Sequence, residues 1–213
     1  MASPAGIDVS KLTRWFDDQV GGIDSDSLVF ELITGGRSNL TYTVSDGVAL
    51  GNGGRRWVLR RPPLGHVLAT AHDMVREHRI ISALADSGVP VPGMIGLCED
   101  NDVNGAPFYV MEFVPGLVVR DVDTAQEVPV AVRHRMSQSL VEVLARLHDI
   151  DVGAVGLTDL SRQGGYIERQ LKRWSTQFEK STTRVVPGVL ETFEILASRI
   201  PTQQGVGIVH GDY

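Results

Sequence analysis

The sequence has one cysteine and no long apolar run, and these two scarcities exclude several classes of protein. Cys98 is the only cysteine among 213 residues, so no disulfide can form within the chain and a reducing compartment is expected. No apolar run approaches the roughly 20 residues that a membrane-spanning helix needs. Residues 1–18 lack the apolar centre of a signal peptide and contain acids that transit peptides avoid. A cytoplasmic protein with no membrane partner is therefore expected.

Basic charge is also scarce, because the formal net charge is −6 and the isoelectric point is about 5.5. The 20 lysines and arginines are scattered along the sequence and form no stripe. This distribution argues against nucleic acid or an anionic membrane as the main partner. With 42% hydrophobic residues, the chain can bury the core of one large domain or of two small lobes.

The order of periodic segments predicts an α+β fold in two lobes. Strands are expected at 28–33, 40–44, 56–61, 94–99 and 108–113, and helices at 70–85, 130–148, 166–179 and 189–199. A shorter helix before them has Ser10 as its expected N-cap, buries Leu12, Trp15 and Phe16, and ends at Gly21. The second helix is expected to be closed by Gly88, and the long helix 130–148 to bury Met136, Leu140, Val143, Leu144 and Leu147. The lobes are expected at 1–114 and 115–213, with a hinge near 114–117.

A glycine turn lies between the first two long strands. It reads Gly35-Gly36-Arg37-Ser38-Asn39, and its position between two strands excludes the phosphate loops that join a strand to a helix. Such a turn can lay backbone N–H groups and a serine hydroxyl over phosphates. Taken alone, a plain hairpin turn is the more usual explanation.

Val58 and Arg60 share one face of the third strand, because side chains alternate along a strand. Val58 could touch a flat apolar base while Arg60 reaches its phosphates. The alternative is that Arg60 and Arg61 form the solvated end of an edge strand.

Glu77 lies on the same helix stripe as Met74, Ile81 and Leu84, which predicts that it points inward. An inward carboxylate is costly to desolvate unless it is paired. Arg60 on the preceding strand is the expected partner, and such a pair would aim the guanidinium at a phosphate. In the alternative arrangement Glu77 reaches the rim and pairs with a neighbouring side chain of its own helix.

Two further segments carry possible chemistry. The fifth strand runs into Pro115-Gly116, where the Glu112 C=O and the Val114 N–H could read the edge of an adenine. At the other end of the sequence, an apolar strand delivers Asp212 to a tight turn, and a carboxylate placed there can act as a general base.

Taken together and in order, these segments resemble the aminoglycoside phosphotransferase family and its relatives, small-molecule kinases of the protein-kinase-like fold. The glycine turn and the third strand look most like a branch that also occurs fused to acyl-CoA dehydrogenase domains. The resemblance rests on residues 35–42, 57–63, 76–79, 111–116, 144–148 and 209–212. It implies a five-stranded antiparallel N-terminal lobe followed by an incomplete helical C-terminal lobe.

The resemblance also implies an activity, the transfer of the γ-phosphate of ATP to a hydroxyl group of a small molecule. Asp212 would be the catalytic base, and Arg60 would stand where the family usually has a lysine, with Glu77 as its partner. Arginine is always charged and grips phosphate in a bidentate way, so the replacement is chemically tolerable. The nucleotide would be bound by Gly35, Gly36, Ser38, Asn39, Val58, Arg60, Glu112 and Val114.

The family pattern continues past Asp212 to an asparagine and then to an aspartate that binds Mg²⁺. ATP and Mg²⁺ are thus the expected cofactors, with the metal ligands past Tyr213. Alone, the 213-residue chain is expected to be poorly active, marginally stable and apolar on the outer faces of its last three helices.

The resemblance favours a hydroxyl-bearing metabolite, such as a hydroxyacyl compound, over an aminoglycoside as the acceptor. Two other functions stay open. One is a catalytically inactive nucleotide-binding or interaction module. The other is a hydrolase whose metal is bound by His210 and Asp212, although metal sites usually need three or four protein ligands.

Overall fold

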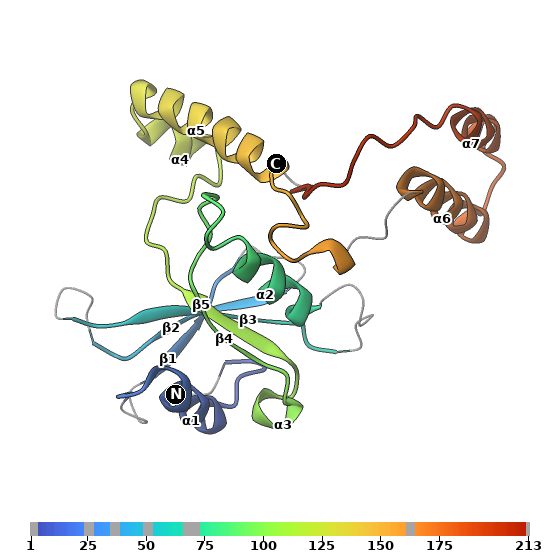
Figure 1. The fold of residues 1–213 in the computed structure, drawn as a ribbon. Coiled ribbons are helices and arrows are strands. Elements are labelled where there is room, and N and C mark those ends of the chain that lie inside the picture. Colours follow the sequence, from blue (N-terminus) through green and yellow to red (C-terminus); the bar gives the residue numbers. More distant parts are fainter. Residues whose placement is uncertain are drawn as a thin grey trace. The chain divides into compact units, whose positions relative to one another are not determined.

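The computed structural model describes residues 4–23, 28–34, 39–48, 53–65, 73–160 and 165–211, and Figure 1 shows its elements. The first half of the chain is mixed and the second half is helical, as the periodicity predicts. In chain order the elements are α1 Val9–Val20, β1 Val29–Leu32, β2 Leu40–Ser45, β3 Arg56–Arg61, α2 Met74–Ala83, β4 Met94–Cys98, α3 Asn101–Asn104, β5 Phe108–Glu112, α4 Val122–Glu127, α5 Val130–His148, the 3₁₀ turn η2 Thr158–Leu160, α6 Tyr166–Ser181 and α7 Val189–Ser198.

The five strands form one antiparallel sheet in the order β1-β2-β3-β5-β4. The predicted bounds of every strand agree with the structure to within one residue at each end. Strand β3 lies in the middle of the sheet, between β2 and β5 (Figure 1). The alternative that Arg60 and Arg61 end an edge strand is therefore wrong, because β3 has a neighbouring strand on each side.

Helix α1 begins slightly earlier than predicted. Its N-cap is Asp8, whose carboxylate accepts a hydrogen bond of 3.2 Å from the Lys11 N–H, whereas Ser10 lies inside the helix and donates its hydroxyl to the same carboxylate. An aspartate is a better acceptor for an exposed backbone N–H at a helix start, where the helix dipole also favours negative charge. Gly21 ends the helix as predicted, with φ at 69°, a conformation that favours glycine.

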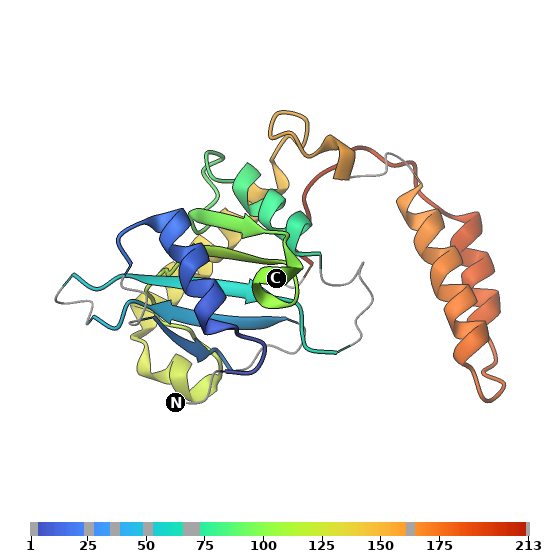
Figure 2. The same cartoon turned by 90° about the horizontal axis from the view of Figure 1, so that it is seen from below.

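The core lies between α1 and one face of the sheet, and Figure 2 shows α1 lying across the strands. Leu12 and Phe16 are fully buried there and Trp15 packs against them, as predicted. Rings from the helix and the sheet meet edge to face, with Trp15 and Phe108 centroids 4.9 Å apart. The sheet contributes Phe30, Tyr42, Val44, Trp57, Leu59, Cys98, Phe108 and Val110 to this core.

Helix α2 covers the opposite face of the sheet, where it contacts β4 and β5 (Figure 1). Asp73 caps it by accepting from the Arg76 N–H at 2.9 Å. The helix ends at Leu84 and not at Gly88, because Leu84 and Ala85 donate to carbonyls three residues back, which tightens the last turn. The predicted start at residue 70 lies outside the described residues.

The sequence patterns missed two short helices, α3 and α4. Helix α3 is a single turn that ends at Gly105, whose φ is 72°, and the sequence suggested only a turn there. Helix α4 begins with Asp121, which accepts from the Thr124 N–H at 2.8 Å. Both are too short to show a 3.6-residue apolar period, so only their capping aspartates mark them in the sequence.

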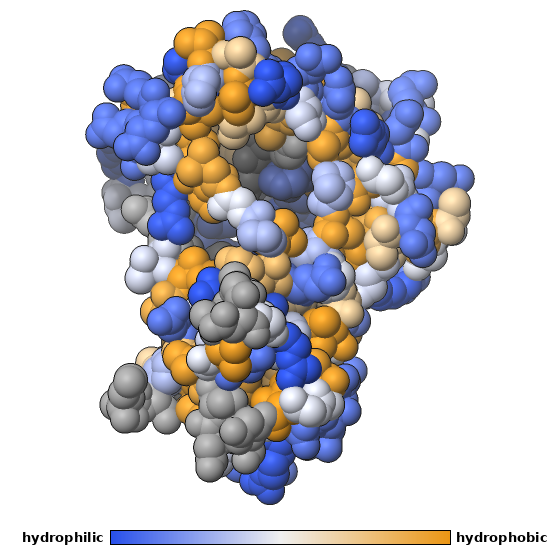
Figure 3. Space-filling view, turned by 90° about the vertical axis from the view of Figure 1, so that its left-hand side faces the viewer, coloured by the Kyte–Doolittle hydropathy of each residue, from blue (hydrophilic) through white to orange (hydrophobic). Residues whose placement is uncertain are grey.

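The chain divides into two compact units, Met1–Arg146 and Leu147–Tyr213, and the predicted lobe boundary at 114/115 stays a prediction. Helix α5 has its predicted bounds, but of its five expected core residues only Leu147 is buried, and Met136 and Leu140 are exposed. Apolar surface on α5, α6 and α7 was expected, and the described residues show it. Apolar atoms, orange in Figure 3, reach the surface of the face drawn there. The exposed apolar residues of these helices are Val130, Met136, Leu140, Val141, Tyr166, Ile167, Trp174, Leu190, Ile195 and Leu196.

Helices α6 and α7 pack against each other as a hairpin inside the second unit. Among the described residues, no helix has both the length and the hydropathy that a bilayer crossing requires.

Candidate functional site

Arg60 and Glu77 form an ion pair, as predicted. Arg60 Nε donates to Glu77 Oε2 at 2.8 Å, and about a third of each side chain is exposed, at 30% and 32%. Strand β3 turns Arg60 away from the core that lies under α1, and α2 brings Glu77 over the same face of the sheet. The alternative in which Glu77 pairs within its own helix is therefore wrong.

Two more side chains hold the Glu77 carboxylate. Asn39 Nδ2 donates to Oε1 at 2.9 Å, and the Tyr109 hydroxyl donates to Oε2 at 3.1 Å. Glu77 thus gathers donors from β3, from β5 and from the residue that precedes β2. We call Asn39, Arg60, Glu77 and Tyr109 the Glu77 cluster.

Tyr109 was not predicted to be a site residue, and the bond between Asn39 and Glu77 was not predicted, whereas the predicted nucleotide contact of Asn39 stays a prediction. Tyr109 lies directly opposite Arg60 in the β3–β5 register. A sequence signal existed, because Tyr109 and Met111 alternate with the core residues Phe108 and Val110. This signal identifies Tyr109 as a neighbour of Arg60 only once the register of β3 and β5 is known.

The surroundings of the Glu77 cluster fix its charge state. Burial, and then the nearby Glu77 carboxylate, raise the pKa of the Tyr109 phenol far above its usual value, so it stays a hydrogen-bond donor. The imidazole of His78, whose ring meets that of Tyr109 edge to face, has its pKa lowered by desolvation. The Tyr109 phenol and the His78 imidazole are therefore both favoured in their neutral forms beside the Arg60–Glu77 pair.

Arg60 keeps hydrogen-bonding capacity at Nη2. Its Nη1 donates to the Thr41 hydroxyl at 3.2 Å, and among the described residues nothing accepts from its Nη2. A guanidinium with available N–H groups is well suited to bind the oxygens of an anion.

Apolar surface lies next to that guanidinium. Val58 is buried two residues before Arg60 on the same face of β3, and its cross-strand neighbours are Thr43 and Met111. This face of the sheet thus places the Arg60 guanidinium beside the apolar side chains of Val58 and Met111. Such an arrangement suits a ligand that has a flat ring and an anionic tail.

The backbone after β5 leaves the sheet. Glu112 is tied to Gly93 twice, since its N–H donates to the Gly93 C=O at 2.8 Å and its carboxylate accepts from the Gly93 N–H at 3.1 Å. Val114, two residues on, lies outside any helix or strand and is 66% exposed. No partner for its backbone N–H occurs in the part of the chain that the structure describes, so this N–H is placed to bind a ligand.

Four of the predicted site residues, Gly35, Gly36, Ser38 and Asp212, lie outside the described residues. Their roles stay predictions. Within the described ranges, no group of three His, Cys, Asp or Glu side chains could hold a metal ion.

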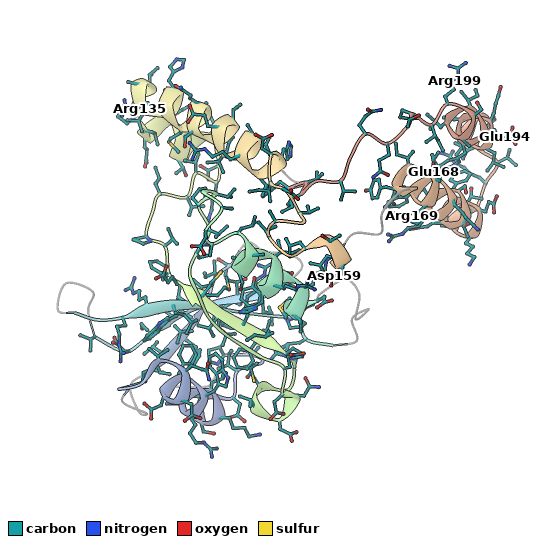
Figure 4. The ribbon with its side chains drawn as sticks, in the orientation of Figure 1. Arg135, Asp159, Glu168, Arg169, Glu194 and Arg199 are labelled. Carbon is teal, nitrogen blue, oxygen red and sulfur yellow. The ribbon has the colours of Figure 1, made fainter. Side chains whose placement is uncertain are left out.

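The hairpin of α6 and α7 carries many charges, and Figure 4 shows side chains such as Arg169 on α6 and Glu194 on α7 projecting from it. One face of α6 forms a shallow groove of about 560 Å³. Its lining contains four cationic residues and no acid: Arg169, Lys172, Arg173, Thr176, Gln177, Lys180 and Ser181. Four of the 20 lysines and arginines thus lie together on one face of α6, which we call the α6 basic face.

Comparison with known proteins places this geometry in a family. The sequence model of the phosphotransferase enzyme family matches residues 29–213. A solved structure from Ralstonia eutropha JMP134, provisionally assigned as an aminoglycoside phosphotransferase, is 34% identical, has a TM-score of 0.74, and is matched over 97% of this chain and 58% of its own. A second solved structure, the ternary complex of APH(2″)-IIa with streptomycin and ATP, is 13% identical to this chain and has a TM-score of 0.58. The match covers 93% of this chain and 58% of the APH(2″)-IIa chain, and it shows that the two share a fold. The predicted α+β fold is thus confirmed.

A curated relative shows the link to dehydrogenases. Acyl-CoA dehydrogenase family member 10 of Mus musculus is 37% identical over 178 residues, which are 84% of this chain and 16% of the relative. The chain therefore spans only a small part of that relative's length.

Proposed function

Because this chain belongs to the phosphotransferase enzyme family, we propose that it binds ATP on the Glu77 cluster face of the sheet and serves the transfer of the γ-phosphate to a hydroxyl group of a small molecule. The observation that carries the proposal is the Arg60–Glu77 pair, in which the Arg60 Nη2 has no acceptor among the described residues. Catalysis of phosphoryl transfer consists mainly of positioning and of neutralising phosphate charge. A guanidinium held through Nε, with Nη2 available to a phosphate oxygen, performs both tasks.

The neighbouring surfaces provide for the rest of the nucleotide. Val58 and Met111 would contact the adenine ring. Val58 lies two residues before Arg60 on β3, and Met111 is the cross-strand neighbour of Val58 on β5. The Glu112 C=O and the exposed Val114 N–H would read the adenine edge. Gly35, Gly36 and Ser38 directly precede Asn39, which donates to Glu77, and we propose that they contact the phosphates.

Asp212 is the proposed general base, which would accept the proton of the acceptor hydroxyl as oxygen attacks phosphorus. Mg²⁺ stays a prediction of the resemblance. The carboxylates and imidazoles of the described residues form no site for it, so no step of this mechanism is assigned to the metal.

We propose that the acceptor is a hydroxyl-bearing metabolite with an anionic group, such as a hydroxyacyl compound. One observation supports a hydroxyacyl compound over a polycationic aminoglycoside, since the curated relative carries an acyl-CoA dehydrogenase name.

ATP binding by the purified 213-residue chain tests the proposal, measured by calorimetry beside adenosine as a phosphate-free probe. Arg60→Ala is expected to weaken ATP binding about 30-fold or more and to leave adenosine binding nearly unchanged. Arg14→Ala, on the exposed side of α1, is the matched control and should bind like the original protein. The absence of ATP binding, or equal losses for ATP and adenosine, would overturn the assignment.

Turnover is measured as well, because an enzyme and an inactive nucleotide-binding module would both bind ATP, and phosphorylation of an acceptor would exclude the module. The low activity expected of the 213-residue chain is checked by following ATP consumption with Mg²⁺ and a panel of hydroxy acids. Robust phosphorylation of any acceptor would show that the chain is more active than the sequence predicts.

A further inference from the structure

We propose that Asn39 and Tyr109 are positioning residues, which hold Glu77 on a single nitrogen of Arg60 and so keep the Arg60 Nη2 available for phosphate. The inference rests on the proposed function and extends it to two residues that would not touch the nucleotide themselves. Its basis is the way in which three donors share the two oxygens of one carboxylate.

Left to itself, an arginine–carboxylate pair prefers two parallel hydrogen bonds. Both oxygens of Glu77 would then accept from neighbouring nitrogens of the guanidinium, and the second of these would be Nη2, which lies beside Nε. The pair in this protein uses one bond only, from Nε to Oε2.

Asn39 accounts for the missing second bond. Its amide donates to Oε1 at 2.9 Å, so this oxygen is held by the residue that precedes β2 and not by the guanidinium. Asn39 is itself buried, which fixes the direction of its amide. Asn39 directly follows residues 35–38 in the sequence, and its bond joins the start of β2 to α2.

Tyr109 holds the other oxygen. Its hydroxyl donates to Oε2 at 3.1 Å, the oxygen that also accepts from Arg60 Nε. Rotation of the carboxylate towards the two-bond arrangement would break the bond from Asn39 to Oε1, and the bond from Tyr109 to Oε2 restrains the carboxylate against that rotation. The two residues therefore act together in keeping Nη2 available.

The groups around the carboxylate do not change charge near neutral pH. Burial keeps the Tyr109 phenol protonated, and desolvation favours neutral His78. Thr41, which accepts from Arg60 Nη1, does not titrate. A pH response in a variant of this cluster can therefore be traced to the new side chain.

The test compares ATP with adenosine in Asn39→Ala and Tyr109→Phe, measured by calorimetry on the 213-residue chain. Each variant is expected to lower the ratio of ATP affinity to adenosine affinity about tenfold, because Glu77 then captures Nη2 and one phosphate contact is lost. Thermal unfolding, measured on the same samples, should change little, since the ion pair gains the bond that the removed donor lost. Asn101→Ala, on exposed α3, and Tyr166→Phe, on exposed α6, are the matched controls.

A third variant uses pH to exclude a merely structural role. Asn39→Asp places a second carboxylate next to Glu77, and two carboxylates at that distance share a proton, which raises the pKa of one of them. The ATP to adenosine ratio, taken relative to the original protein at each pH, is expected to be low at pH 8 and to recover towards pH 5.5. The new carboxyl group, once protonated, can donate to Glu77 as the asparagine amide does.

The outcomes distinguish the two proposals. If the original chain binds no ATP, the proposed function fails and this inference fails with it. If the original chain binds ATP and the three variants keep its ATP to adenosine ratio, or lose both affinities together with stability, only the positioning role is overturned.

Discussion

Arg60 on β3 and Tyr109 on β5 are direct cross-strand neighbours, and their side chains end on the same oxygen of Glu77. The register of the two strands therefore decides which donors Glu77 meets. A slip of one residue in either strand would turn that strand's side chain to the opposite face of the sheet and separate it from Glu77. The ion pair is thus a property of the sheet as much as of α2, which supplies the acceptor.

Arg60→Lys distinguishes the charge of the guanidinium from its shape. A lysine keeps the charge but has one nitrogen to serve Glu77, Thr41 and a phosphate, so ATP affinity is expected to fall about three- to tenfold, less than in Arg60→Ala. The same substitution removes the possibility of a two-bond pair with Glu77. Asn39→Ala should therefore have little further effect in the Arg60→Lys background, and a double-mutant cycle on ATP affinity measures this coupling. Additive losses would show that Asn39 does not act through Arg60.

Arg61 is expected to stabilise the fold without serving the nucleotide. It is 5% exposed, and its guanidinium donates to the carbonyls of Gly6, Pro62 and Asn104, so it joins β3 to the segment before α1 and to α3. Burial lowers its pKa, but an arginine remains charged. Arg61→Ala should lower the free energy of unfolding by about 2–4 kcal/mol, since it leaves a cavity and unpaired carbonyls.

Urea denaturation checks the Arg61 expectation, and hydrogen exchange locates the effect. Amides of α1 should exchange faster in Arg61→Ala than in the original protein, whereas Arg14→Ala on exposed α1 should leave both measurements unchanged. An Arg61→Ala protein of unaltered stability would contradict the anchoring role.

Asp46 should make stability depend on pH in the acid range. Burial pushes the pKa of its carboxyl up, but hydrogen bonds from the N–H groups of Arg55 and Val48 and from the Arg55 side chain outweigh it and leave the pKa below 3.8. The folded state thus binds this proton less readily than the unfolded state, so the contribution is complete above about pH 4 and is lost as pH falls through the folded pKa. Asp46→Asn should be less stable at pH 7 by about 1 kcal/mol, with the difference shrinking by pH 3. The urea midpoints of Asp46→Asn and of the original protein, measured at pH 7 and pH 3, check this expectation. An equal difference in stability at the two pH values would contradict the proposed role of the Asp46 carboxylate.

Much of the fold followed from local patterns, and the reasons are physical. Strand alternation and turn residues set β3 at Arg56–Arg61, and the apolar period set α5 at Val130–His148, with both pairs of bounds correct. The caps were harder to predict. Asp8 and Ser10 are both good N-cap residues two positions apart, and only the backbone conformation, extended at Asp8, decides between them.

Part of the site could be predicted, because the cost of desolvating an inward charge can be recognised from one helix and its neighbouring strand. An inward carboxylate at Glu77 requires a partner, and the nearest strand offered Arg60, so the pair could be inferred without coordinates. Tyr109 and the Asn39–Glu77 bond could not be inferred in this way, because they depend on which residues of separate strands and helices stand opposite each other. The exposure of Met136 and Leu140 also escaped the helix pattern, since a pattern identifies an apolar face but not what covers it.

The backbone after β5 offers the sharpest test of adenine recognition. Val114→Pro removes a single N–H at a position that is exposed and outside any helix or strand, so the fold should tolerate it. If that N–H reads the adenine edge, affinity for both ATP and adenosine should fall about tenfold, in contrast to Arg60→Ala, which spares adenosine. Glu112→Ala is the matched control, because it removes only the carboxylate that accepts from Gly93 and keeps the backbone C=O. Calorimetry with ATP and with adenosine measures both affinities. An unchanged adenosine affinity in Val114→Pro would show that the Val114 N–H does not bind adenine.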